Sequence, residues 1–122
     1  MINSTMEAKT NTEPKAILLS IAREFTRFPG ARYIEDGPGS GQEFRDKKLI
    51  PKFEEACRLD VNLIIDFDGA AGYATSFLEE AFGGMAREYG AEEVLRRLRF
   101  KSDDEPLLAQ EVETYIRNSG GR

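Results

Sequence analysis

The sequence predicts an α/β domain in which helices pack on a mixed or mainly parallel sheet of about four strands. Residues 61–67 form an almost continuous apolar run, typical of a central strand that is covered on both faces. Residues 76–89 then carry apolar side chains at helical spacing. Strand-like and helix-like segments alternate along the rest of the chain, as they do where helices connect parallel strands.

The first half of the chain begins with a predicted buried strand at residues 16–19 and a second, short strand at residues 31–34. Ser40 and Glu43 have the spacing of a capping box, so a helix is expected to start at Ser40. Pro51 falls within the apolar pattern of this helix. We therefore expect a kink there, or two short helices.

In the second half, Ser76 and Glu79 repeat the capping-box spacing, and Gly90 is expected to end the helix that they open. Residues 94–100 alternate as a strand does. The acidic residues of 103–106 then introduce a last helix. Its expected inward face consists of Leu108, Val112, Tyr115 and Ile116.

A chain of 122 residues is the size of one domain with one core. We assign this domain to residues 15–117. Residues 1–14 are polar and are expected to form a disordered N-terminal arm, and residues 118–122 a flexible tail. Neither an internal repeat nor a linker interrupts the domain.

Composition narrows the function classes. The formal charge of −5 argues against nucleic-acid binding, and the basic run at residues 96–101 is interpreted first as part of a strand. There is no histidine, the commonest general base and metal ligand, so we expect no enzyme, no metal and no cofactor. The single cysteine, Cys57, fits a small core residue in a reducing compartment. Without a membrane span or signal peptide in the sequence, we expect a cytoplasmic protein.

The first candidate site follows the central strand. Asp66 and Asp68 end this strand, and a glycine-containing loop leads to Thr75 and Ser76 at the start of the next helix. Ligands of open α/β sheets bind beyond such strand ends, and a helix start favours anions. The alternatives are that Ser76 only caps the helix, or that the two aspartates hold a magnesium ion, for which they are an incomplete set.

The second candidate site is a glycine-rich loop before the Ser40 helix, which can cradle a phosphate with its backbone N–H groups. It lacks the ending of a P-loop, and a purely structural turn is the favoured alternative. Flanking arginines can neutralise either an anion or nearby acids. The candidate residues are Arg32, Asp36, Gly37, Gly39, Ser40, Gly41 and Arg45.

The third feature is the pair Gly83 and Gly84 within the best-defined helix. Each glycine costs about 1 kcal/mol relative to alanine in a helix interior. Either another element packs closely against this helix, which we favour, or a partner binds there.

These motifs carry a resemblance to a known family. Residues 63–69 (Leu-Ile-Ile-Asp-Phe-Asp-Gly) and 75–78 (Thr-Ser-Phe-Leu) resemble the switch segment of STAS domains, the fold of anti-sigma factor antagonists. The chain is more closely similar, over residues 28–116, to the STAS-like bacterial family DUF4325. That similarity rests on Arg32-Tyr33, Asp36-Gly37-Pro38, Ser40-Gly41, Phe44-Arg45, the run 65–69, Gly72-Tyr73 and the run 76–84.

The resemblance implies a regulator that switches partners. In such antagonists an unmodified Ser or Thr surface binds a histidine-kinase-type ATPase, and phosphorylation releases it. Ser76 and Thr75 thereby become candidate phosphoacceptors, with Ser76 the better placed, although Ala74-Thr75 stands where antagonists have Asp before the modified residue. The implied partner surface consists of Asp68, Gly72, Tyr73, Phe77, Glu80, Gly83 and Gly84.

The leading hypothesis is therefore a non-enzymatic regulatory module that binds a protein, with a histidine-kinase-type ATPase as the implied partner. The alternative is a nucleotide or phosphate-ligand sensor that uses the loop Gly37–Gly41. A magnesium-dependent enzyme ranks last. Self-association, as a homo-oligomer, is compatible with all three hypotheses.

Overall fold

The computed structural model describes residues 15–120. Three strands, β1 (Ala16–Ser20), β2 (Asn62–Asp66) and β3 (Leu98–Lys101), form one parallel sheet in the order β1-β2-β3. The predictions of an α/β fold and of a central strand at β2 are confirmed, with three strands in place of about four. The predicted arm, residues 1–14, and the last two tail residues lie outside the described part of the chain.

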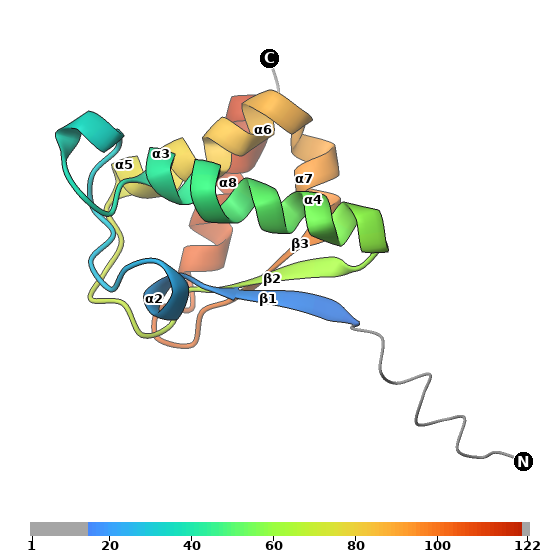
Figure 1. The fold of residues 1–122 in the computed structure, drawn as a ribbon, viewed down its shortest axis with the longest axis horizontal. Helices are drawn as coiled ribbons and strands as arrows, with labels where there is room; N and C mark the ends of the chain where they lie inside the picture. Colours follow the sequence, from blue (N-terminus) through green and yellow to red (C-terminus); the bar gives the residue numbers. More distant parts are fainter. Residues whose placement is uncertain (1–14, 121–122) are drawn as a thin grey trace, which may run out of the picture.

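The helices are stacked mainly on one side of this sheet (Figure 1). In chain order they are α2 (Ile21–Glu24), the 3-10 turn η1 (Ile34–Asp36), α3 (Gly41–Phe44), the π-helical turn η2 (Arg45–Leu49), α4 (Ile50–Leu59), α5 (Thr75–Leu78), the π-helical turn η3 (Glu79–Gly83), α6 (Gly84–Tyr89), α7 (Ala91–Arg97) and α8 (Leu108–Gly120). Residues 118–120, assigned to the tail from the sequence, thus extend α8.

Two helical stretches, 41–59 and 75–89, each contain a π turn and pack against one another. Ser40 caps the first stretch as predicted, because its Oγ accepts a hydrogen bond from the Glu43 N–H at 3.0 Å. The irregularity expected near Pro51 is η2, directly before α4. Pro51 itself lies in the first turn of α4, where its missing N–H is tolerated.

One predicted strand is wrong and another is only partly correct. Residues 31–34 join no strand, because the carbonyls of Ala31 and Arg32 accept hydrogen bonds from the N–H groups of Gly41 and Gln42. The N-terminal part of 94–100 is helix α7, since Val94 also fits helical spacing and is fully buried. Only Leu98 onward forms a strand. Gly90, in contrast, ends α6 as predicted.

The core lies between the helices and one face of the sheet. Leu19, Leu63 and Ile65 are fully buried on that face. On the opposite face Leu18 pairs in register with Ile64, and Leu18 is 53% exposed while Ile64 is partly exposed. Within the described residues β2 is therefore covered on one face, which corrects the prediction of two covered faces. Parallel sheets usually bury both.

Candidate functional site

The carboxyl ends of the three strands meet at one edge of the sheet, where Ser20, Asp66 and Lys101 stand side by side in register. Residues 67–74 follow β2, residues 102–107 follow β3, and residues 25–40 follow α2, the short helix that continues β1. We call these three segments the carboxyl-edge loops. They surround a cleft of about 390 Å³. The cleft is lined by Ser20, Ala22, Arg23, Arg27, Asp66, Asp68, Gly69 and Lys101.

Asp68 ties the loops after β2 and β3 together. Its carboxylate accepts hydrogen bonds from the Asp104 N–H at 2.9 Å and from Lys101 Nζ at 2.7 Å. In return, Asp104 accepts a bond from the Gly69 N–H at 3.0 Å. The hydrogen bond from the Asp104 N–H makes the larger contribution and the bond from Lys101 the next in lowering the pKa of Asp68. Asp68 in turn raises the pKa of Lys101. Both side chains are thus charged at neutral pH.

Asp66 also serves the fold, because one of its carboxylate oxygens accepts a bond from the Asp68 N–H at 2.9 Å. Both aspartates considered as magnesium ligands therefore have partners within the protein. Among the described residues no three acidic or cysteine side chains are grouped to hold a metal ion.

Tyr73 anchors the loop after β2. Its hydroxyl donates a hydrogen bond to the Phe67 carbonyl at 2.7 Å, and its ring meets the Phe67 ring edge-on at 5.3 Å. Burial, reinforced by nearby acids such as Asp66, raises the pKa of Tyr73 well above its usual value. The hydroxyl is thus a neutral structural donor.

The loop after β1 is bonded to the start of the second helical stretch. The Arg27 carbonyl accepts a bond from the Ala71 N–H at 2.8 Å, and Ser76 Oγ donates to the Gly30 carbonyl at 3.3 Å. The N-cap is Ala74, two residues earlier than predicted, so the prediction that Ser76 caps this helix is wrong. Of the two phosphoacceptor candidates, Thr75 is exposed and Ser76 is partly buried.

Arg32 and Arg45, two predicted anion ligands, pair with acids inside the protein. Arg32 Nη1 lies 2.7 Å from Glu79 Oε1, and Arg45 Nη1 lies 2.8 Å from both the carboxylate and the carbonyl oxygen of Glu80. Arg87 also pairs with Glu79 at 2.8 Å. Hydrogen bonds from Arg87 and Arg32 lower the pKa of Glu79 to about 2.

The glycines of the second helical stretch make room for this network. A Cβ on Gly84 would lie 2.4 Å from Arg45 Nη1, and one on Gly83 would lie 2.6 Å from Ser119 Oγ in α8. Close packing, the favoured explanation for the glycine pair, is confirmed.

The predicted partner surface is divided by the fold. Phe77 is fully buried, Glu80 is 8% exposed and Gly83 is buried, so these three residues point inward, which corrects their assignment to a contact surface. Asp68, Gly72, Tyr73 and Gly84 are partly exposed.

The loop Gly37–Gly41 forms a turn that leads into α3. Gly41 is buried, and a Cβ there would lie 2.4 Å from the Phe77 carbonyl oxygen. Ser40 is also buried, and Asp36 accepts a bond from the Tyr33 N–H at 3.2 Å. The backbone of this loop therefore packs against the second helical stretch.

Exposed large apolar side chains mark the carboxyl-edge loops. Phe28 and Leu107 are each 74% exposed, Ile34 is 50% exposed and Tyr33 is 42% exposed. Sequence reasoning missed all four as contact residues. The available signal was an aromatic residue directly before the turn residues Pro29-Gly30, where no core position is expected.

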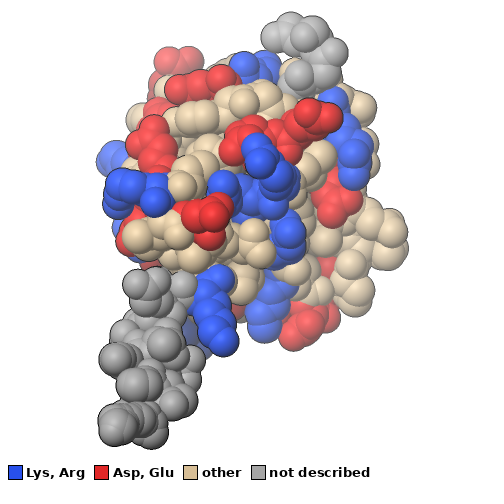
Figure 2. All heavy atoms as spheres, turned by 90° about the vertical axis from the view of Figure 1, so that its right-hand side faces the viewer, with Lys and Arg blue, Asp and Glu red and all other residues tan. Residues whose placement is uncertain are grey.

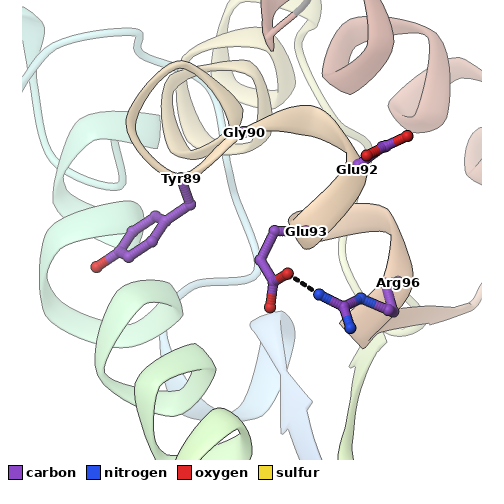
Figure 3. A pocket seen from close by; sticks show the side chains of 5 residues that line it. All are labelled: Tyr89, Gly90, Glu92, Glu93 and Arg96. Carbon is purple, nitrogen blue, oxygen red and sulfur yellow. Dashed lines mark hydrogen bonds and ion pairs between the residues drawn. The ribbon is translucent and has the colours of Figure 1, made fainter.

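A larger cavity, of about 540 Å³, lies where α6 meets α7 (Figure 3). Glu93 and Arg96, one turn apart on α7, form an ion pair at its wall, while the Tyr89 hydroxyl donates to Glu54 at 2.7 Å. Burial and Glu54 raise the pKa of Tyr89 to about 12. This cavity contains none of the site residues predicted from the sequence.

A family model described as the STAS-like domain of unknown function, DUF4325, matches residues 40–108. The chain belongs to this family. The match runs from the Ser40 cap to the first residue of α8 and includes the second helical stretch with its glycine pair. No curated protein and no solved structure gives a match. Within residues 15–120 no helix has the length and apolar character needed to cross a membrane.

Proposed function

We propose that this STAS-like domain is a non-enzymatic, cytoplasmic regulatory module that binds a protein partner through its carboxyl-edge loops. The observation that carries the proposal is the exposure of Phe28, Ile34 and Leu107 on these loops. Large apolar side chains that are exposed on a surface favour protein contact. The loop backbone is held in place by the bonds of Asp68, Tyr73 and Ser76, so little ordering is needed on binding.

The partner that we propose is an ATPase of the histidine-kinase type, in line with partner switching in STAS domains. Thr75 is the better phosphoacceptor candidate because it is exposed beside these loops. A phosphate on Thr75 would add negative charge near Glu79 and Glu111, and this repulsion would alter the contact surface.

Affinity capture from the native host, with mass spectrometry and then reconstitution from purified components, tests the proposal. We expect the full chain to retain an ATPase and Phe28→Ser to lose it. Leu59→Ser is the matched control, because Leu59 is also exposed (46%) but lies at the end of α4. Equal capture by both variants, or the absence of any ATPase from the captured proteins, would contradict the proposal.

The alternative phosphate sensor at Gly37–Gly41 has less support. Its two arginines, Arg32 and Arg45, are already neutralised by Glu79 and Glu80. An anion in that loop would have to displace these carboxylates, and the loss of a buried partner is costly.

A further inference from the structure

A second cleft, of about 380 Å³, opens at the amino edge of the sheet, away from the carboxyl-edge loops. Its lining contains four cations and one carboxylate, a formal charge of 4 − 1 = +3 in a chain whose total is −5. Figure 2 views the molecule from the side on which β2 begins, and lysine and arginine side chains gather in the middle of this face. The lining residues are Lys15, Asp60, Val61, Asn62, Arg96, Arg97 and Arg99.

Arg97 is the most constrained of these cations. Its side chain is 14% exposed, and its Nη1 donates to Asp60 Oδ1 at 3.2 Å and to the Val61 carbonyl at 3.1 Å. Its Nε is the one buried side-chain nitrogen or oxygen that has no hydrogen-bond partner among the described residues. A buried donor without a partner is destabilising, so an acceptor that reached this position would be favourable.

The other arginines are held in place by residues of α7 and by Leu98, directly after it. Arg99 Nη1 donates to the carbonyls of Leu98 at 2.7 Å and Arg96 at 3.1 Å, which fixes its guanidinium beside the cleft. Arg96 pairs with Glu93 and is drawn toward the neighbouring cavity (Figure 3). Lys15 is exposed and lies directly before β1. Lys15, Arg97 and Arg99 therefore supply most of the available donors.

We propose that this amino-edge cleft binds the phosphate group of a small phosphorylated ligand. Guanidinium groups that are already fixed bind phosphate oxygens in pairs, with little loss of side-chain freedom. The excess of cations over carboxylates suits a group that carries two negative charges. A nucleic acid fits less well, because the net negative charge of the rest of the chain repels a polyanion that extends beyond the cleft.

The test is calorimetric titration of the full chain with inorganic phosphate, with ATP and with adenosine. We expect saturable binding of phosphate or ATP that weakens with added salt. Arg99→Gln and Lys15→Gln should each weaken binding about tenfold or more, as expected for the loss of a charge-assisted hydrogen bond. Arg23→Gln is the matched control, because Arg23 is an exposed arginine that lines the carboxyl-edge cleft.

Competition identifies the source of the phosphate. Inorganic phosphate that displaces ATP supports recognition of the phosphate group, whereas adenosine that displaces ATP equally well would overturn it. Thermal melts establish that the variants are folded, and exposed Lys15 keeps the test valid if Arg99→Gln unfolds. The proposal fails if neither ligand binds, if Arg23→Gln alone weakens binding, or if a single-stranded oligonucleotide binds in their place.

Discussion

Two regions of the molecule differ in how strongly packing restricts their residues. One is the contact between the two helical stretches, and the other is the carboxyl-edge loops. Between the stretches, Gly41 lies against the Phe77 backbone and Gly84 against the Arg45 guanidinium, and neither has room for a Cβ; Gly83 is similarly close to Ser119 of α8. In the loops, Phe28 and Leu107 are largely solvent-exposed. The most distinctive run of the sequence, Glu79–Gly84, therefore serves packing, while the surface suited to a partner lies on residues with an ordinary pattern.

Gly41→Ala should have the largest effect on the stability of the contact between the two helical stretches. The new Cβ would lie 2.4 Å from the Phe77 carbonyl oxygen, and backbone cannot move aside as a side-chain tip can. We expect a loss of about 3 kcal/mol in the free energy of unfolding, measured by urea denaturation. Gly30→Ala is the control, because nothing lies within 4 Å of its Cβ position. Equal stability of the two variants would show that the helices can separate freely.

Glu80→Gln should have the next largest effect. Glu80 is 8% exposed and lies 2.8 Å from Arg45 and 3.2 Å from Arg32. Its neutral form removes the closest counter-charge of Arg45 and one of the two carboxylates that pair with Arg32. We expect a loss of about 2 kcal/mol, measured in the same way.

Glu113→Gln provides the matched control for charge removal. Its ion pair with Arg117 is longer, at 3.8 Å, and exposed. Such pairs contribute about 0.5 kcal/mol or less. A similar loss in both variants would mean that the buried network adds nothing specific to the contact.

Acid should weaken the same contact through Glu79. Its pKa falls from the ordinary 4.5 to about 2 on folding, chiefly through the Arg87 hydrogen bond. A carboxylate whose pKa is lower in the folded protein than in the unfolded one stabilises the folded state. This contribution is complete above pH 4.5 and is lost as the pH falls toward 2. Relative to wild type, Glu79→Gln should therefore flatten the stability curve between about pH 5 and pH 2, by roughly 1 to 2 kcal/mol. Parallel curves for the two proteins would contradict this assignment.

How much of the fold could be predicted depended on whether the decisive contacts were local. The β2 strand, the Ser40 cap and the end of α6 at Gly90 follow from neighbouring residues, and the structure confirms them. Residues 94–97 fit both strand alternation and helical spacing, so only their packing against α8 separates the two.

The site depended on contacts that span long stretches of sequence. Arg32 and Arg45 meet their carboxylates 48 and 35 residues further along the chain, so spacing could not tell a bound anion from an internal partner. Ser76 has capping-box spacing, but its hydroxyl donates to the carbonyl of Gly30, 46 residues away. The exposure of Phe28 likewise depends on how the loop after β1 lies against the loop after β2.

Phe28→Ser tests the carboxyl-edge loops, and of the four substitutions it should change the free energy of unfolding least. The Phe28 side chain is 74% exposed, and its backbone N–H donates to Thr26 Oγ1 at 3.1 Å regardless of the side chain. We expect the free energy of unfolding to stay within about 0.5 kcal/mol of wild type. Because the same variant is expected to lose the partner, urea denaturation and capture together separate folding from binding. A large loss of stability would instead place Phe28 with the packing residues. The main observation that supports partner binding by the carboxyl-edge loops would then no longer hold.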